Sequence, residues 1–180
     1  HPYLKSYLFA FFIYSIALQT VILIASYFGA AEIQWKDDSD RMTGLIASIL
    51  IIQLIAIVGA LVTAKVSEKF GNIYTLIILN ILWAFLCLFA FFVKTPFQFF
   101  IAAGFVGIVM GGMQALSRST FSKFLPKTDN TTSFFSFFDV TQKVSIVIGM
   151  TLFATIDQIT GSMRNSMLFF MIFFFIGAFL

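Results

Sequence analysis

The sequence predicts an all-α polytopic membrane protein with six transmembrane helices. Hydrophobic residues make up 60% of the chain and charged residues only 11%, whereas soluble domains carry about 25% charged residues. The mean hydropathy is +0.99. Apolar runs of about 20 residues, the length that crosses a bilayer as a helix, recur along the chain. The first run is too long for a signal peptide. The lipid bilayer is therefore the first partner we expect.

Short polar segments separate the six spans. We expect the spans at approximately residues 4–31, 43–64, 73–93, 97–116, 137–156 and 166–180, within one transmembrane domain over residues 1–180. The chain begins with His1 rather than Met and ends at Leu180 inside an apolar run. We therefore expect it to be a segment of a longer protein.

The basic residues predict how the helices are oriented. With successive segments assigned to alternate sides, seven basic residues fall on one side and four on the other: Lys5, Lys65, Lys69, Arg118, Lys123, Lys127 and Lys143 against Lys36, Arg41, Lys94 and Arg164. Because cytoplasmic segments carry more Lys and Arg, both chain ends are expected in the cytoplasm. This asymmetry also accounts for the basic pI near 9.1, so no nucleic-acid partner is expected.

Polar side chains concentrate in the first and fourth spans. Tyr14, Gln19 and Thr20 lie in the first span and Gln114 in the fourth. Polar groups in a membrane face the bundle interior or a wet cavity, so these two spans should be innermost and these four residues are candidate substrate-cavity residues. For Gln19 and Thr20, a hydrogen bond between helices fits equally well.

The fourth span also carries small residues suited to close helix packing, namely Gly104, Gly107, Gly111 and Gly112. The third and sixth spans, by contrast, are almost uniformly large and apolar, and we expect them outermost. Trp83 in the third span is expected at the interface or facing lipid.

The order inner, intermediate, outer thus repeats after three helices. Ala64, Glu68 and Gly71 follow the second span with the same spacing as Ala154, Gln158 and Gly161 after the fifth, 90 residues later and on the opposite side of the membrane. Such a match is typical of an inverted-topology repeat.

Arg118, Asp139 and Lys143 form the one charged constellation near the spans. Asp139 precedes Lys143 by four residues, the favourable order for a helical ion pair, and stands near the expected start of its helix, where the dipole favours an anion. We hypothesise a cytoplasmic latch in which Arg118 and Lys143 share Asp139 and release it when a gate opens. The alternative is a Lys143 that reaches back to the lipid headgroups.

Two inverted helix triplets resemble one half of a major facilitator superfamily transporter. Residues 64–72, AKVSEKFGN, resemble the superfamily's cytoplasmic signature, with Ala64 in place of its glycine and Asn72 in place of its second base. The resemblance implies that Ala64, Glu68, Lys69 and Gly71 help to set the conformational equilibrium, as gating residues do. For Glu68 and Lys69 the alternative is a solvated pair of little energetic weight.

A closer similarity covers nearly the whole chain. GFVGIVMGGMQALSRSTFSKFLP (104–126), SFFSFFDVTQKVSIVIGMTLF (133–153) and QITGSMRNSM (158–167) are similar to the C-terminal half of the vacuole-effluxer-like (autophagy-related permease) family. The specific part is Gly-Gly-x-Gln-x-x-Ser-Arg-Ser. Members often carry an acidic residue and a glycine where this chain has Ile16 and Ala17. That departure removes a possible proton-coupling carboxylate from the first helix.

The resemblance implies secondary active transport of a small polar solute by alternating access, with amino-acid efflux as one form because fungal relatives are implicated in it. It also implies a second six-helix half as partner, upstream in a twelve-helix chain, a small-molecule substrate and a location in the bacterial inner membrane. A non-transporting membrane scaffold or a dimeric half-transporter is the alternative.

No enzymatic function is expected. The chain contains one histidine, His1, and neither a Gly-x-Ser-x-Gly nor a His-Glu-x-x-His run. Its carboxylates stay out of the span centres. We expect no catalytic residues, no metal site and no cofactor.

Overall fold

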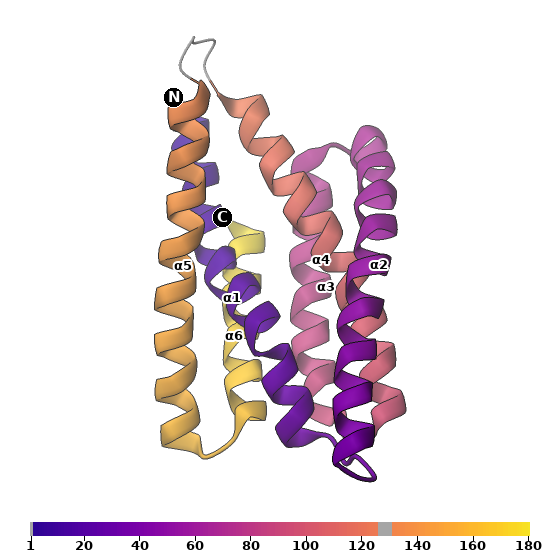
Figure 1. Cartoon of the computed structure of the whole chain (residues 1–180). Helices are drawn as coiled ribbons and strands as arrows, with labels where there is room; N and C mark the ends of the chain where they lie inside the picture. The colour runs from indigo at the N-terminus through magenta and orange to yellow at the C-terminus, as the bar shows by residue number, and fades with distance from the viewer. Residues whose placement is uncertain (1, 126–130) are drawn as a thin grey trace.

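A computed structural model describes residues 2–125 and 131–180 (Figure 1). His1, Pro126 and Lys127, which entered the expectations above, lie outside the described residues. The described chain folds into six helices: α1 Pro2–Glu32, α2 Asp38–Phe70, α3 Asn72–Phe92, α4 Pro96–Phe124, α5 Thr131–Thr160 and α6 Met163–Phe179. Among them α1 to α5 are long and apolar enough to cross a membrane, and α6 is a shorter apolar helix. The predicted all-α polytopic fold is confirmed.

Several helices continue beyond the spans that hydropathy marks. The signature segment after Ala64, expected as a loop, is the last part of α2, and the Ser-Arg-Ser segment after Leu116 is helical to Phe124. Helix α5 begins at Thr131, about two turns before Asp139. Lys, Glu, Arg and Ser are tolerated in helices, so the end of an apolar run does not mark the end of the helix.

Local signals determine where the helices begin. Asp37 caps α2 by accepting a hydrogen bond from the Asp40 amide (2.7 Å). Thr95 and Gln98 form a reciprocal capping box at the start of α4, with Pro96 at the first helical position. Such caps satisfy amide groups that would otherwise lack partners.

Gly71 and Gly161 follow the last residues of α2 and of the α5 segment, and both have positive φ. They are the two residues with positive φ among those described, at 88° and 64°. Each amide donates to a carbonyl four residues earlier, that of Ser67 (2.9 Å) and that of Asp157 (2.8 Å). Glycine adopts positive φ without steric cost, so the two matched glycines of the sequence repeat stop equivalent helices.

The helix pairings follow the same two-fold repeat. Helix α2 packs on α4 as α5 packs on α1, α3 packs on α4 as α6 packs on α1, and α3 and α6 pack on each other. In Figure 1, α3 and α6 form the back of the bundle, α2 and α5 with the lower part of α1 form the front, and α4 runs from behind α2 at the bottom to the front at the top. Exchanging the first three helices with the last three therefore reproduces the arrangement.

The glycine-rich face of α4 packs against α2. A Cβ at Gly107 or Gly111 would collide with the α2 backbone at Ile52 or Ala56, and one at Gly112 would collide with Thr63. Gly104 is different, because its Cβ would meet the Ile55 side chain at an ordinary 3.6 Å. Small residues here let two helix backbones approach closely, which is how helices associate in lipid.

The core runs along α1 and between α1, α3 and α6. Ala17, Leu18 and Thr20 of α1 are fully or almost fully buried. Trp83 is also fully buried and stacks on Phe174 of α6 with ring centroids 5.5 Å apart, so its expected lipid-facing position is wrong. The reason is that α3 and α6 pair tightly at the back of the bundle and use large aromatic groups to fill their shared interface.

Candidate functional site

A polar pocket of about 260 Å³ lies where α1, α4 and α5 converge. We call it the polar pocket. It is lined by Phe11 and Leu18 of α1, Gln114, Ser117 and Arg118 of α4, and Phe138 and Gln142 of α5. A shallower open depression adjoins it beyond Arg118, lined by Gln114, Ala115, Arg118, Ser119, Ser122 and Phe135. Two amides, a hydroxyl and a guanidinium thus meet in one pocket of a predominantly apolar bundle.

Helical spacing brings these side chains together. Gln114, Ser117 and Arg118 stand at i, i+3 and i+4 on α4, and Phe138 and Gln142 at i and i+4 on α5, so each group shares one face of its helix. Helices α4 and α5 have no extended packing contact with each other, because each packs instead on α2 or α1. The pocket occupies the space that this arrangement leaves between them.

An ion pair bridges α4 and α5 at the edge of the pocket. The Arg118 Nη2 atom donates to Asp139 Oδ1 at 2.5 Å, and the two side chains are 55% and 45% exposed. The guanidinium also lies over the Phe138 ring, 5.8 Å from its centroid. Exposed ion pairs contribute little stability, so this link can open at modest cost.

Aromatic rings close the end of the pocket beyond Arg118. Phe121 of α4 lies against Phe138 and Phe135 of α5, with ring centroids 4.8 and 5.5 Å apart. Phe11 of α1 stacks on Phe138 at 4.1 Å. These contacts join the three pocket helices on the side where the chain is expected to meet the cytoplasm.

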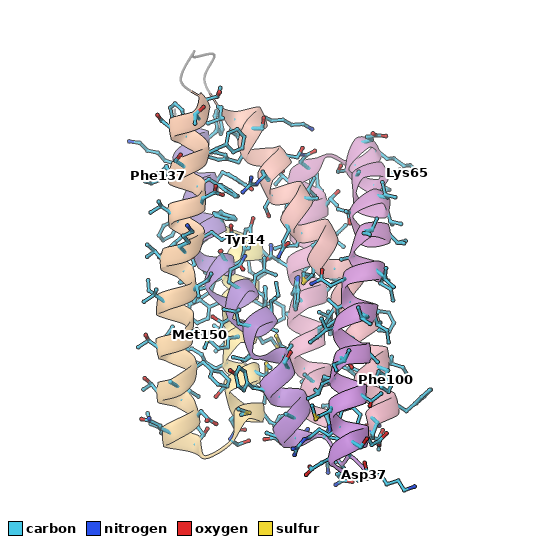
Figure 2. The ribbon with its side chains drawn as sticks, in the orientation of Figure 1. Tyr14, Asp37, Lys65, Phe100, Phe137 and Met150 are labelled. Atoms are coloured by element: carbon cyan, nitrogen blue, oxygen red, sulfur yellow. The ribbon has the colours of Figure 1, made fainter. Side chains whose placement is uncertain are left out.

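Tyr14 (labelled in Figure 2) does not line the polar pocket and lines a second pocket, between α1, α3 and α6. Its hydroxyl shares a hydrogen bond of 2.7 Å with Ser117 Oγ, and the Tyr7 hydroxyl donates to the Ser117 carbonyl at 2.6 Å. Both tyrosines are buried. They therefore hold Ser117, which does line the pocket, in a fixed position.

Of the other three predicted cavity residues, one lines the polar pocket and two do not. Gln114 lines the polar pocket and its neighbouring depression. Thr20 is fully buried, donates to the Ile16 carbonyl (2.7 Å) and packs against Gly149 of α5. Gln19 is 9% exposed, and its amide nitrogen has no hydrogen-bond partner within the described part of the chain. Neither Gln19 nor Thr20 lines the polar pocket.

The signature segment is tied to α4 through Asn72. Glu68 and Lys69 are exposed, and Lys69 lies over the Phe70 ring. Asn72, which stands where the signature usually has a base, donates to Thr120 Oγ1 (3.0 Å) and accepts from the Lys123 ammonium (2.9 Å). A cation from α4 therefore reaches the position from which the signature's own base is missing.

Lys143 is exposed and makes no salt bridge among the residues that the structure describes. Because α5 begins at Thr131, Asp139 lies well inside the helix. The expectation that the helix N-terminus stabilises its charge is wrong, since the dipole effect is confined to the first turn. Asp139 is instead paired with Arg118.

At the opposite end of the bundle, Arg164 forms a network of hydrogen bonds that the sequence analysis did not predict. Arg164 of α6 donates to a Glu32 carboxylate oxygen (2.6 Å), to the Glu32 carbonyl (2.9 Å) and to the Phe91 carbonyl (2.6 Å), and lies over the Phe28 ring. We call this set the Arg164 clamp. It joins the start of α6 to the ends of α1 and α3, where helix carbonyls lack partners and the dipole favours a cation.

Sequence reasoning also missed Ser117, Phe138 and Gln142 as pocket residues. Gln142 was detectable as an uncharged polar group inside an apolar span, one turn from Asp139. Within residues 2–125 and 131–180, no three His, Cys, Asp or Glu side chains are grouped as a metal site requires.

Comparisons with known proteins match the whole bundle. The sequence profile of the family described as vacuole effluxer Atg22 like matches residues 2–180. The chain is 29% identical to the MFS-type transporter YxiO of Bacillus subtilis over 95% of its length, and 34% identical to autophagy-related protein 22 of Vanderwaltozyma polyspora over 93%. It is 30% identical to autophagy-related protein 22 of Saccharomyces cerevisiae over 91%.

The alignments cover 38%, 33% and 32% of these three relatives, so the chain spans about a third of their length. No solved structure gives a significant match. A profile that spans the described helices from end to end, together with relatives that share the same stretch, establishes the relationship. The chain belongs to the vacuole effluxer Atg22-like family.

Proposed function

We propose that this chain is the C-terminal six-helix half of a major facilitator transporter that moves a small polar solute by alternating access, with amino-acid efflux as its activity. The observation that carries the proposal is the polar pocket between α1, α4 and α5. Polar groups within the spans of a membrane bundle are costly where they face lipid, so they line the bundle interior or wet cavities and mark solute pathways. Relatives named as an MFS-type transporter and as members of a vacuole effluxer family support transport as the general activity.

The partner half would pack on the front of the bundle. Helices α2 and α5, on that side in Figure 1, carry many exposed large apolar groups. In alternating access two such halves rock about a site between them and open it to one side at a time. Gln114 and Gln142 would be this half's contribution to the site, with Ser117 held behind them by Tyr7 and Tyr14.

The Arg118–Asp139 pair would act as the latch on the cytoplasmic side. It links α4 and α5 beside the aromatic contact of Phe121 with Phe135 and Phe138, so separating the two helices there would require both the ion pair and this contact to open. Lys143 lies one turn beyond Asp139 on α5 and makes no salt bridge among the described residues, so in this latch Arg118 would hold the carboxylate without it. The segment from Ala64 to Gly71 would add to this control through Asn72 and its contacts with α4.

Transport by the full-length protein in liposomes tests the proposal. A panel of radiolabelled amino acids is loaded, and efflux is followed with and without a proton gradient. Gln114→Ala should reduce efflux at least several-fold, while Gln34→Ala, which alters an exposed glutamine outside the pocket, should leave it unchanged. Normal efflux in Gln114→Ala would contradict the assigned pathway. Absence of transport for every solute would favour a scaffold.

A further inference from the structure

We propose that Arg118 and Asp139 are a binding pair for zwitterions, in which the guanidinium takes the solute's carboxylate and the Asp139 carboxylate takes its ammonium group. The inference rests on the proposed transport function and assigns the solute-reading residues within it. It differs from a simple latch because the two charges would remain in use, each on a solute group, after they separate from each other.

Arg118 leaves most of its hydrogen-bond donors without an acceptor among the described residues. A guanidinium has five N–H groups, and in the part of the chain that the structure describes Arg118 donates to a single protein oxygen, on Asp139. Arg164 provides the contrast, because its Nε, Nη1 and Nη2 atoms all donate to protein oxygens. Arg164 is fully engaged in holding helices together, whereas Arg118 has donors available for another acceptor.

The Arg118 side chain that carries these donors lies in the pocket wall. Among the described residues, Arg118 is the charged side chain that lines both the polar pocket and the adjoining depression, and Asp139 stands at their edge as its ion-pair partner. Guanidinium binds a carboxylate through two parallel hydrogen bonds, a geometry that a lysine cannot reproduce. Asp139 binds Arg118 through one oxygen, which leaves its remaining acceptor sites open to an ammonium group.

The opposite charges of Arg118 and Asp139 favour a solute that carries both charges. A solute that carried only a carboxylate would draw Arg118 away and leave Asp139 unpaired, and an amine alone would do the reverse. In either case one half-exposed charge would be left without its partner. A zwitterion supplies both missing partners, so the loaded pocket stays neutral. This selects against simple anions and cations as well as for the correct solute.

The pocket walls indicate what the rest of the solute can be. Phe11, Leu18 and Phe138 provide apolar surface in addition to the amides of Gln114 and Gln142. A volume of about 260 Å³ lies just below the range of pockets for drug-sized molecules. These dimensions suit a single amino acid with an apolar side chain better than a peptide.

Binding to the purified full-length transporter tests the pair with three probes of matched shape. Leucine carries both charges, leucinamide lacks the carboxylate, and 4-methylpentanoate lacks the amine. We expect leucine to bind about tenfold or more tightly than either analogue, because each lost contact is a charge-assisted hydrogen bond. Arg118→Gln should abolish the preference for leucine over leucinamide, and Asp139→Asn the preference over 4-methylpentanoate.

Arg41 and Asp38 supply the matched control. They form a salt bridge of 3.0 Å between side chains that are 43% and 87% exposed, at the start of α2 and outside the pocket. Arg41→Gln and Asp38→Asn should leave both preferences as in the unaltered protein. Arg118→Lys, which keeps the charge and the fold, should weaken leucine binding at least several-fold because it loses the two-point contact.

The outcomes separate the pair from the transport function. Leucine efflux by a protein whose preferences are unchanged in Arg118→Gln and Asp139→Asn would overturn the binding pair and leave transport standing. Equal binding of leucine and both analogues to the unaltered protein would also overturn it. A protein that moves no solute in liposomes would remove the proposed function, whatever the binding results.

Discussion

At the scale of single residues, the Tyr14 hydroxyl positions Ser117 through a hydrogen bond. The two groups are 2.7 Å apart, and both are buried. Ser117 in turn lines the polar pocket. A side chain that sequence analysis assigns to the cavity therefore affects the cavity through its neighbour.

Tyr14→Phe should lower the free energy of unfolding by about 0.6 kcal/mol, the usual value of a hydrogen bond between membrane helices. The reason is that Ser117 Oγ loses its partner while the ring packing remains. Thermal unfolding in detergent measures the change. Tyr3→Phe alters a tyrosine that is 78% exposed and should have no effect. A similar loss in both variants would show that the hydrogen bond is not the cause.

The Arg164 clamp should contribute much more to the free energy of unfolding than the Tyr14 hydroxyl does. Arg164→Ala removes the partner of the Glu32 carboxylate and of two helix-terminal carbonyls, so we expect a loss of about 2 kcal/mol or more. Glu32→Gln keeps an acceptor for Arg164 and should cost less. The same thermal unfolding measurement ranks the variants. Arg41→Ala, in an exposed pair, should cost no more than about 0.5 kcal/mol, and an equal cost for Arg164→Ala would contradict the clamp.

At the scale of helices, the close approach of α2 and α4 depends on particular glycines. Gly111→Ala places a methyl group against the backbone of Ala56, and a backbone cannot move aside as a side chain can. We expect a loss of about 1–3 kcal/mol, as for other overpacked sites, measured as reduced thermal stability.

Gly104→Ala is the matched variant on the same helix. Its new methyl group meets only the end of the Ile55 side chain at 3.6 Å, and alanine favours helix by about 1 kcal/mol over glycine. Stability should stay the same or rise slightly. If both variants lose stability equally, the contact between backbones is not what limits the approach of the two helices.

The helix ends show what a sequence does not state directly. Hydropathy located all six helices because the cost of polar groups in hydrocarbon is a property of each segment alone. It placed the ends of α2 and α4 too early, because both helices continue through the polar segments that begin at Lys65 and Ser117. Gly71 and Gly161 were the better markers, because a positive φ stops a helix wherever the membrane surface lies.

At the scale of the whole molecule, the repeat was predictable and the site only in part. The matched motifs 90 residues apart correspond to equivalent helix ends. Gln114 was found because it interrupts an apolar span. Ser117 and Gln142 were missed because a pocket between three helices depends on how each is rotated about its axis. Trp83 was misplaced for the same reason, since the aromatic-rich α3 and α6 expose one face and bury the other.

Orientation in the membrane is a separate prediction. Asp37 and Lys65 lie at opposite ends of the bundle in Figure 2, and the distribution of basic residues assigns Lys65 to the cytoplasm. In intact bacterial cells, a membrane-impermeant maleimide should label Asp37→Cys and spare Lys65→Cys until the cells are opened. The reverse pattern would invert the assignment and place both chain ends outside.

The central claim is that the polar pocket lines the solute path, and thiol labelling of the full-length transporter during efflux tests it most directly. Gln142→Cys introduces a thiol in the pocket wall, and Val147→Cys introduces one at a position of α5 that is 67% exposed and lies outside the pocket. A charged thiol reagent should block leucine efflux through Gln142→Cys, leucine should slow that block, and Val147→Cys should be insensitive. Efflux that continues unchanged after Gln142→Cys has been fully modified would contradict the claim.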